Sequence, residues 1–442
     1  MTKLADRLRE ALKAGRSGEL IRESPFERFG FSHDPFRSDP DPYNPDFLIE
    51  REDVLYNFAL RIGDATRLFE QDPQTPFRHV LAHGLRGCGK SSLARHFDRE
   101  WKQIGFQDFE TLYVDLATWR ELPEFLEPFG SSSKTLETYE SFLSQIKFIE
   151  KPLIIFINSL DYTITGTAAI PQIRDFISDI ESQAQHGVIL IGFVNSLTLT
   201  VLLEEEHLML SRVFLSYFNP KHFFFPVFSK NEIIKLVNQR LKVARTPTSL
   251  FTDKALELIA DYSLGIPSVA LKLASDCLHE LIVLDTDKAT VNVITPVIEE
   301  LGYEEAVRLV ESMDTDVDEE PISILTPKRR EIIALMLSHH LRERFFFPNT
   351  GVDGLRSSDL AKDLGVNLST MNYHLKPLTT SQPVPILATI DDVHDARSKI
   401  FCVEWDSQIA SALEIITVYQ RLTHRRYSIE ASSILFARRE SP

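Results

Sequence analysis

The chain has 442 residues, of which 43% are apolar and 25% are charged, a composition typical of folded soluble proteins. This composition excludes disorder throughout, because the chain has enough apolar surface to offset the entropy lost on folding. The formal net charge of −16 argues against a protein that coats nucleic acid or an anionic membrane through its total charge. Any contact with DNA would therefore have to be local.

The cysteines and the apolar runs indicate the compartment. Cys88, Cys277 and Cys402 lie far apart without paired spacing, which predicts neither a disulfide framework nor a zinc site. The N-terminus is charged and lacks the apolar core of a signal peptide, and no apolar run approaches the roughly 18 residues of a membrane span. We expect a cytoplasmic protein of roughly two to four domains.

Residues 1–47 are expected to form an N-terminal helix followed by an irregular segment. Leu4, Leu8 and Leu12 recur every four residues, as on one face of a short amphipathic helix. The segment 26–47 is rich in Pro, Asp and Phe. Its prolines exclude a helix, and its phenylalanines predict packing against another part of the chain.

Residues 48–229 alternate between strand-like and helical patterns. The strand-like runs are short, continuous and rich in Val, Ile, Leu or Phe: HVLAH, TLYVDL, LIIFIN, GVILIGFV and HFFFPVF. Such runs are typical of strands that are buried on both faces of a parallel sheet. Together with the helical segments between them, they predict a doubly wound α/β domain.

Further units follow in the chain. Residues 230–313 carry apolar residues at three- and four-residue spacing, which predicts a helical bundle. Residues 314–325 are expected to be an acidic linker. Residues 326–405 show three helical patterns and then two strand-like runs, and residues 406–442 are expected to form a C-terminal helix and tail.

The segment HGLRGCGKSS contains the strongest motif, because it fits the phosphate-loop pattern G-x-x-x-x-G-K-[ST] between a predicted strand and helix. Its glycines let backbone amides face phosphate oxygens, and the helix N-terminus adds positive potential. Lys90 would reach the β- and γ-phosphates, and the Ser91 hydroxyl would bind Mg²⁺. The predicted ATP-binding residues of the loop are Gly84, Leu85, Arg86, Gly87, Cys88, Gly89, Lys90, Ser91 and Ser92.

The end of the LIIFIN run departs from the pattern of active ATPases. Acidic residues usually stand there to hold Mg²⁺ and to polarise the attacking water, whereas this chain has Asn158 and Ser159. The first acid is Asp161. Either Asp161 reaches back to the metal and takes part in catalysis, or hydrolysis is slow and ATP acts as a switch. As a third reading, Asp161 is a loop acid that caps the next helix.

Two more residues are candidates for catalysis. Asn195 ends the fourth predicted strand, where it would sense the γ-phosphate or, alternatively, form an ordinary turn. Arg212 precedes the last predicted strand, where it would reach the nucleotide of a neighbouring subunit or lie on the surface like many helical arginines.

With the phosphate loop, the strand-end Asn158, Arg212 and the helical bundle in this order, the chain resembles AAA+ ATPases, especially origin-recognition and Cdc-type replication initiators and related transposition-regulator ATPases. FLIEREDVLYNF resembles the segment that packs over adenine, with Arg51 at its basic position. DYSLGIPSVALKLASDCL resembles the lid helix that carries a second sensor. The resemblance implies an α/β P-loop AAA+ core with a parallel sheet, an α-helical lid over residues 230–313 and a C-terminal winged-helix domain.

The chain also departs from this family. The lid arginine of the family falls at Ser268, and Lys272 one turn later is a possible substitute. The changes at Asn158, Ser159 and Ser268 remove groups that promote hydrolysis, but they leave the groups that bind a triphosphate. Whether the protein is an active ATPase therefore stays open.

The unit 326–405 resembles a winged helix. NLSTMNYHLKPL would be its recognition helix, capped by Asn367, and DDVHDARSK would be its wing. The predicted DNA-contacting residues are Ser369, Thr370, Asn372, Tyr373, Lys376, Arg397 and Lys399. The unit holds ten Lys and Arg against nine Asp and Glu, and winged helices also bind proteins, so a protein partner is an open alternative.

These features predict an initiator-like protein that binds ATP and Mg²⁺, binds duplex DNA and assembles or recruits partners in an oligomer. The alternative is a STAND-like, transposition or defence regulator. In that case the winged helix binds protein, and ATP is a switch or a structural ligand.

Overall fold

A computed structural model describes residues 26–31, 33–37, 45–49, 51–104, 108–118, 139–163, 172–202, 215–219, 221–244, 250–311, 326–346, 354–380, 385–392, 398–403 and 411–418. The predicted N-terminal helix, the acidic linker and the arginine-rich tail lie outside these residues. Within them, no helix is both long enough and apolar enough to cross a membrane. Cys88, Cys277 and Cys402 are free cysteines in the structure.

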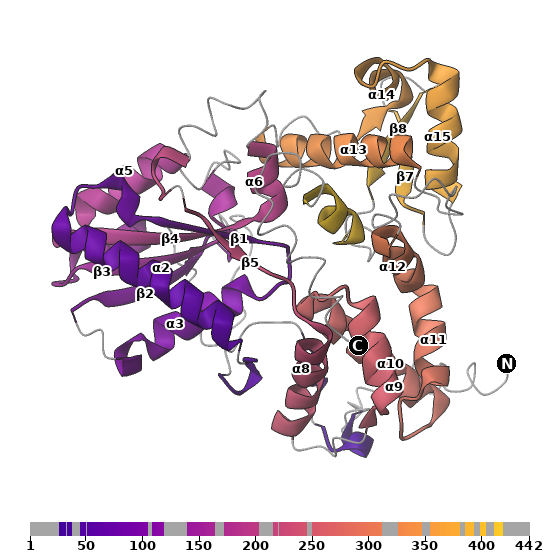
Figure 1. Cartoon of the computed structure of the whole chain (residues 1–442), viewed down its shortest axis with the longest axis horizontal. Coiled ribbons are helices and arrows are strands. Elements are labelled where there is room, and N and C mark those ends of the chain that lie inside the picture. The colour runs from indigo at the N-terminus through magenta and orange to yellow at the C-terminus, as the bar shows by residue number, and fades with distance from the viewer. Residues whose placement is uncertain are drawn as a thin grey trace, which may run out of the picture.

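A five-stranded parallel sheet forms the centre of the first half (Figure 1). Its strands lie in the order β2-β3-β4-β1-β5. They are β1 (Val80–Gly84), β2 (Glu110–Asp115), β3 (Leu153–Asn158), β4 (Val188–Asn195) and β5 (Phe223–Phe225). The five predicted runs are therefore confirmed as strands, and β5 ends early because Pro226 follows it.

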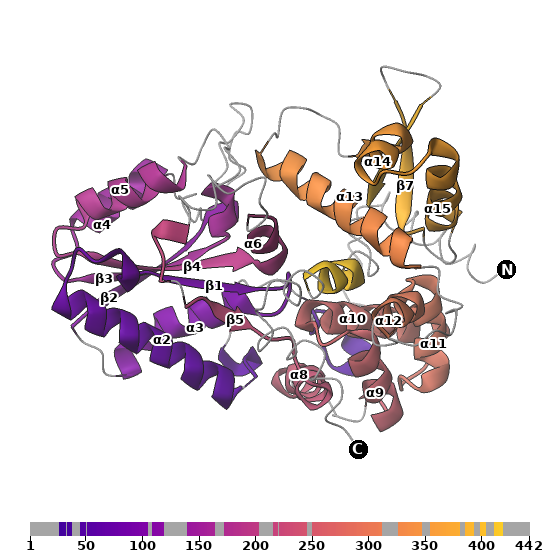
Figure 2. The same ribbon diagram turned by 45° about the horizontal axis from the view of Figure 1, so that its top comes forward.

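Helices cover both faces of the sheet, which explains why its strands are apolar without alternation (Figure 2). One face packs on α2 (Glu52–Gln71) and α3 (Lys90–Ile104). The other packs on α4 (Tyr139–Lys147) and α5 (Ile173–Gln183). The short helix α6 (Ser196–Leu202) follows β4, and the 3-10 turns η3 (Pro76–Arg78), η4 (Leu116–Thr118) and η5 (Leu160–Thr163) lie between these elements.

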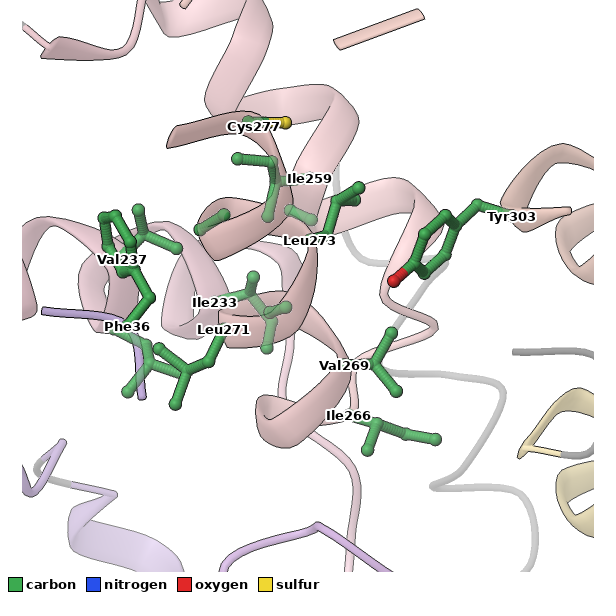
Figure 3. Packing of buried hydrophobic residues seen from close by; sticks show 14 of the residues in the cluster. Phe36, Ile233, Val237, Ile259, Ile266, Val269, Leu271, Leu273, Cys277 and Tyr303 are labelled. Atoms are coloured by element: carbon green, nitrogen blue, oxygen red, sulfur yellow. The ribbon is translucent and has the colours of Figure 1, made fainter. Parts of the chain in front are cut away.

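A helical bundle follows the sheet, where the spacing of apolar residues predicts helices. It comprises α8 (Lys230–Val243), α9 (Asp253–Tyr262), α10 (Pro267–Leu284), α11 (Val291–Glu300) and α12 (Tyr303–Glu311). Figure 3 shows part of its core, including Ile233, Ile259 and Leu273, which are fully buried. The continuous apolar pattern over 295–313 forms two helices, because Gly302 adopts a φ of 72° between α11 and α12.

The irregular N-terminal segment packs on this bundle, as its phenylalanines predict. It contains the 3-10 turns η1 (Glu27–Phe29) and η2 (Pro45–Phe47). Phe29, Phe31 and Phe36 are buried in the bundle's core, and Phe36 is labelled in Figure 3. The segment therefore completes the hydrophobic core of a bundle that begins only at Lys230.

The C-terminal unit, residues 326–403, contains three helices and a small antiparallel sheet. The helices are α13 (Pro327–Phe346), α14 (Ser357–Asp363) and α15 (Leu368–Thr380), and the strands are β6 (Leu355–Arg356), β7 (Leu387–Asp391) and β8 (Lys399–Val403). The sheet has the order β6-β8-β7. β7 and β8 are the two predicted runs, whereas β6 is too short for its two residues to show a strand pattern.

A last helix, residues 411–418, lies between the bundle and the C-terminal unit (Figures 1 and 2). Seven of its eight residues are buried. Ala412, Ile415 and Val418 join the core of the bundle, and Leu413 and Ile416 join the core of the C-terminal unit. This helix therefore connects two hydrophobic cores.

Candidate nucleotide-binding site

The phosphate loop joins the end of β1 to the start of α3. Gly87 and Gly89 have φ values of 78° and 95°, a conformation that side chains other than glycine rarely adopt. At Gly87 a Cβ atom would also lie only 1.9 Å from the Ser268 hydroxyl. The glycines of the motif thus serve both the turn and the close approach of the bundle.

The Lys90 side chain is held at the phosphate loop by backbone carbonyls of the loop. Its ammonium donates to the carbonyls of Gly84 at 2.7 Å and Leu85 at 2.9 Å. A cation at this position, beside the N-terminus of the 15-residue α3, favours the binding of phosphate.

A cavity of about 230 Å³ opens beside the loop. Its polar end is formed by Gly87–Ser92, and its other walls come from the N-terminal segment, α2, β5 and the bundle. The apolar lining residues include Phe47, Ile49, Val54, Phe228, Leu236 and Leu271. The cavity therefore joins an apolar wall suited to a planar base with a polar loop suited to phosphates.

The bundle reaches the loop through the N-terminus of α10. The Ser268 amide donates to the Gly87 carbonyl at 3.3 Å, and Pro267 and Ser268 line the cavity. The 18-residue helix thus adds the positive end of its dipole to the site. The side chain of Lys272, the possible substitute for a lid arginine, is 61% exposed. Its Nζ forms an ion pair with Asp276 Oδ2 at 3.4 Å.

Arg51 connects the core to the bundle at the edge of the cavity. Its guanidinium donates to Glu232 at 2.8 Å and to the carbonyls of Pro226 and Val227 at 3.0 Å, and it lies over the Phe228 ring. These contacts fix the wall of the cavity. Arg51 lines the cavity, and its hydrogen bonds go to protein groups, so its predicted role in binding the nucleotide stays a prediction.

A polar network lies at the carboxyl ends of β2 and β3. The Ser91 hydroxyl donates to Asn158 Oδ1 at 2.9 Å, and Asn158 Nδ2 donates to Asp115 at 2.9 Å. The Ser159 hydroxyl donates to the same carboxylate at 3.1 Å. β2 therefore supplies, through Asp115, the carboxylate that is missing at the end of β3. Ser159, with φ 57°, holds a strained conformation in this network.

Sequence reasoning missed Asp115, although a signal existed. Asp115 is the last residue of the β2 run and pairs in register with Asn158, and the carboxyl ends of parallel strands meet at one sheet edge.

Asp161 lies in η5 and is buried. Burial raises its pKa to about 6, while its own backbone amide, Lys90 and Thr198 act in the opposite direction. Its role in catalysis or in holding the metal stays a prediction.

Asn195 ends β4, and its Oδ1 accepts a hydrogen bond from the Leu197 amide at 2.9 Å, which is the turn role considered above. Burial raises the pKa of Glu414 in helix 411–418, and the Asn195 side chain acts in the opposite direction by favouring the charged form of that carboxyl. Glu414 Oε1 accepts from the Arg86 amide of the phosphate loop at 3.3 Å. No local pattern predicts this contact, because the two residues are 328 positions apart.

The remaining predicted residues lie elsewhere. Arg212 and Arg397 fall outside the described residues. On α15, Ser369, Asn372, Tyr373 and Lys376 are exposed and Thr370 is partly buried, and Lys399 is exposed on β8. The Thr370 amide donates to Asn367 Oδ1 at 2.8 Å, so the predicted cap of this helix is confirmed.

The strand order β2-β3-β4-β1-β5, the phosphate loop after β1 and the helical bundle that follows agree with the predicted α/β P-loop fold of the AAA+ type. The bundle is called the lid below.

No protein-family model matches the sequence, and no curated protein matches it either. Among similar solved structures is the Aeropyrum pernix ORC1 protein in complex with DNA, with 17% identity, a TM-score of 0.44 and coverage of 89% of this chain and 99% of that chain. The ADP form of the Aeropyrum pernix ORC2 protein has 11% identity, a TM-score of 0.45 and the same coverage. The Thermotoga maritima RuvB Holliday junction branch migration motor has 17% identity and a TM-score of 0.38, covering 81% and 94%.

Proposed function

We propose that the protein is an ATP-binding switch of the AAA+ type that hydrolyses its nucleotide slowly. The observation that carries this proposal is the cavity of about 230 Å³, which is bounded by the phosphate loop, the segment before α2 and the N-terminus of α10. Phosphates would lie on the loop, and the base would lie against the apolar wall that includes Phe228 and Leu271.

The residues present fit a Mg²⁺ ion. The Ser91 hydroxyl, the Asn158 amide oxygen and the Asp115 carboxylate are hard oxygen donors joined by one hydrogen-bond network. Bound Mg²⁺ would neutralise charge on the β- and γ-phosphates. Asp115 supplies the carboxylate of this network. Because it accepts hydrogen bonds from Asn158 and Ser159, its capacity to activate water is reduced. Slow hydrolysis follows from this arrangement.

The C-terminal unit is proposed to be a winged helix that binds duplex DNA. Its order of elements, helix, strand, two helices and then two strands, supports this identification. α15 would be the recognition helix, because Ser369, Asn372 and Lys376 lie exposed on it. The proposal includes an oligomer in which the nucleotide governs assembly or recruitment.

One observation favours a second candidate function, in which the winged helix binds a protein. Leu368, Tyr373 and Ile390 are 48%, 69% and 53% exposed on α15 and β7. These exposed apolar side chains would suit a protein interface, in which tyrosine is enriched.

Lys90→Ala tests the nucleotide site. We expect at least a tenfold loss of affinity for ATP with Mg²⁺ in a calorimetric titration, because a charge-assisted contact to phosphate contributes about 1.5–3 kcal/mol. Lys254→Ala, which removes an exposed lysine of α9, is the matched control and should bind like the wild type. Equal ATP affinity in the wild type and Lys90→Ala would overturn the site. Turnover of the wild type above about 1 s⁻¹ would contradict slow hydrolysis.

A further inference from the structure

Helix 411–418 holds one carboxylate against the phosphate loop. The helix is wedged between the lid and the C-terminal unit, as Figure 2 shows, and its apolar residues are shared between the two cores. Glu414 lies among these residues and is 5% exposed. Its position is therefore fixed by hydrophobic packing on both sides of the helix.

Glu414 faces groups of the phosphate loop that attract a negative charge. Its Oε1 accepts a hydrogen bond from the Arg86 amide at 3.3 Å. Burial raises the pKa of Glu414, while Arg86, Lys90 and Asn195 act in the opposite direction. A buried carboxylate is costly unless such partners compensate it. Here the partners are the Lys90 ammonium, the Arg86 amide and the Asn195 side chain.

These same groups would face the last phosphate of a bound nucleotide. Lys90 is the residue expected to reach the γ-phosphate, and Asn195 is the candidate sensor for it. A γ-phosphate would bring additional negative charge next to the Glu414 carboxylate, in a buried setting where like charges repel strongly. A diphosphate ends one group earlier and leaves the carboxylate in place.

We infer that Glu414 determines which nucleotide the site prefers: with helix 411–418 docked, the site favours a nucleoside diphosphate, and a triphosphate displaces the carboxylate together with its helix. This inference rests on the proposed nucleotide site. It also gives the switch a physical route, because the displaced helix is the one that joins the lid to the C-terminal unit.

Glu414→Gln is the direct test, because glutamine has nearly the same shape and no charge. We expect the affinity for a non-hydrolysable ATP analogue with Mg²⁺ to rise at least tenfold, and the affinity for ADP to change less than about threefold. Glu300→Gln, at an exposed acid that ends α11, is the matched control and should change neither affinity. Equal changes for the two nucleotides, or no change for either, would overturn the inference.

A second measurement uses the wild-type chain and does not depend on the folding of a variant. Hydrogen exchange of the amides of 411–418 should be faster with the ATP analogue than with ADP. Identical exchange in both complexes would refute the displacement of the helix. If the wild type binds neither nucleotide, the proposed function itself fails, which is a different outcome from an unchanged preference.

Discussion

Buried titratable side chains surround the phosphate loop and are shifted toward their neutral forms. His83, just before the loop, has its pKa lowered to about 3 by burial, with His222 and Lys90 acting in the same direction. Burial also raises the pKa of Asp161 to about 6 and that of Glu414 above its usual value. The common cause is exclusion of water, which also strengthens every charge interaction that a nucleotide would meet there.

His83 gives a prediction about stability and pH. Its folded-state pKa of about 3 lies below the unfolded value of 6.5, so the unfolded chain binds the extra proton first. The stability that depends on neutral His83 is complete above pH 6.5 and is lost as the pH falls toward 3. The loss amounts to about 1.4 kcal/mol for each pH unit within this window.

His83→Asn should remove that dependence, since asparagine does not titrate and can still bond the Ser196 hydroxyl, which lies 2.9 Å from His83 Nδ1. Between pH 7.5 and 5.5, urea unfolding should therefore show a smaller loss of unfolding free energy in the variant, by about 1.4 kcal/mol. His186→Asn, at an exposed position, is the control. Parallel pH profiles for the wild type and His83→Asn would contradict the prediction.

At the level of elements, the junction between core and lid depends on a few main-chain contacts. α10 touches the loop through Ser268 and Gly87. Arg51 immediately precedes α2, and its guanidinium donates to the two carbonyls after β5 and to Glu232 of α8. Glu232 in turn caps α8 together with Ser229. The start of α2, the end of β5 and the start of α8 are thus held as one unit.

Arg51→Ala should weaken this unit. The guanidinium makes three hydrogen bonds in a half-buried setting, so we expect a loss of about 2–3 kcal/mol in unfolding free energy and weaker nucleotide binding. Arg51→Lys should recover only part of the loss, because lysine lacks the planar fork. Arg67→Ala removes an exposed arginine of the same helix and should cost less than about 1 kcal/mol. Similar losses for Arg51→Ala and Arg67→Ala would refute this role.

The sequence predicted those elements whose burial imposes a local pattern of apolar residues. The five strands of the core show it because burial on both faces demands continuous apolar runs. The break at Gly302, the two-residue β6 and the position of helix 411–418 depend on contacts between distant segments. The phosphate loop was predicted because its motif is local, and Asp115 was predictable from its place at the end of a strand. The contact between Glu414 and the loop joins residues 328 positions apart, so only the fold shows it.

At the scale of the whole molecule, charge is distributed unevenly between the units. The formal charge is +1 for residues 326–405 and +1 for residues 406–442. Because the whole chain carries −16, residues 1–325 carry −18. The acidity belongs to residues 1–325, which include the parallel sheet, the lid and the predicted linker. An acidic body beside a nearly neutral C-terminal unit predicts that DNA binding is weak, local and sensitive to salt.

The salt dependence of duplex DNA binding tests this prediction. Each phosphate contact contributes about −0.9 to the slope of log K against log salt, so the paired variant Lys376→Ala and Lys399→Ala should flatten the slope by about 2. Both lysines are exposed on the C-terminal unit, and Lys254→Ala on the lid, which should leave the slope unchanged, is the control.

Absence of wild-type binding at about 50 mM salt, where phosphate contacts are strong, would exclude the DNA reading. The exposed Leu368, Tyr373 and Ile390 would then be the features to test against a protein partner. A flattened slope with nucleotide-dependent affinity would instead connect the two ends of the molecule. Helix 411–418 touches the cores of both the lid and the C-terminal unit, so a change at the phosphate loop can reach α15 through packed side chains.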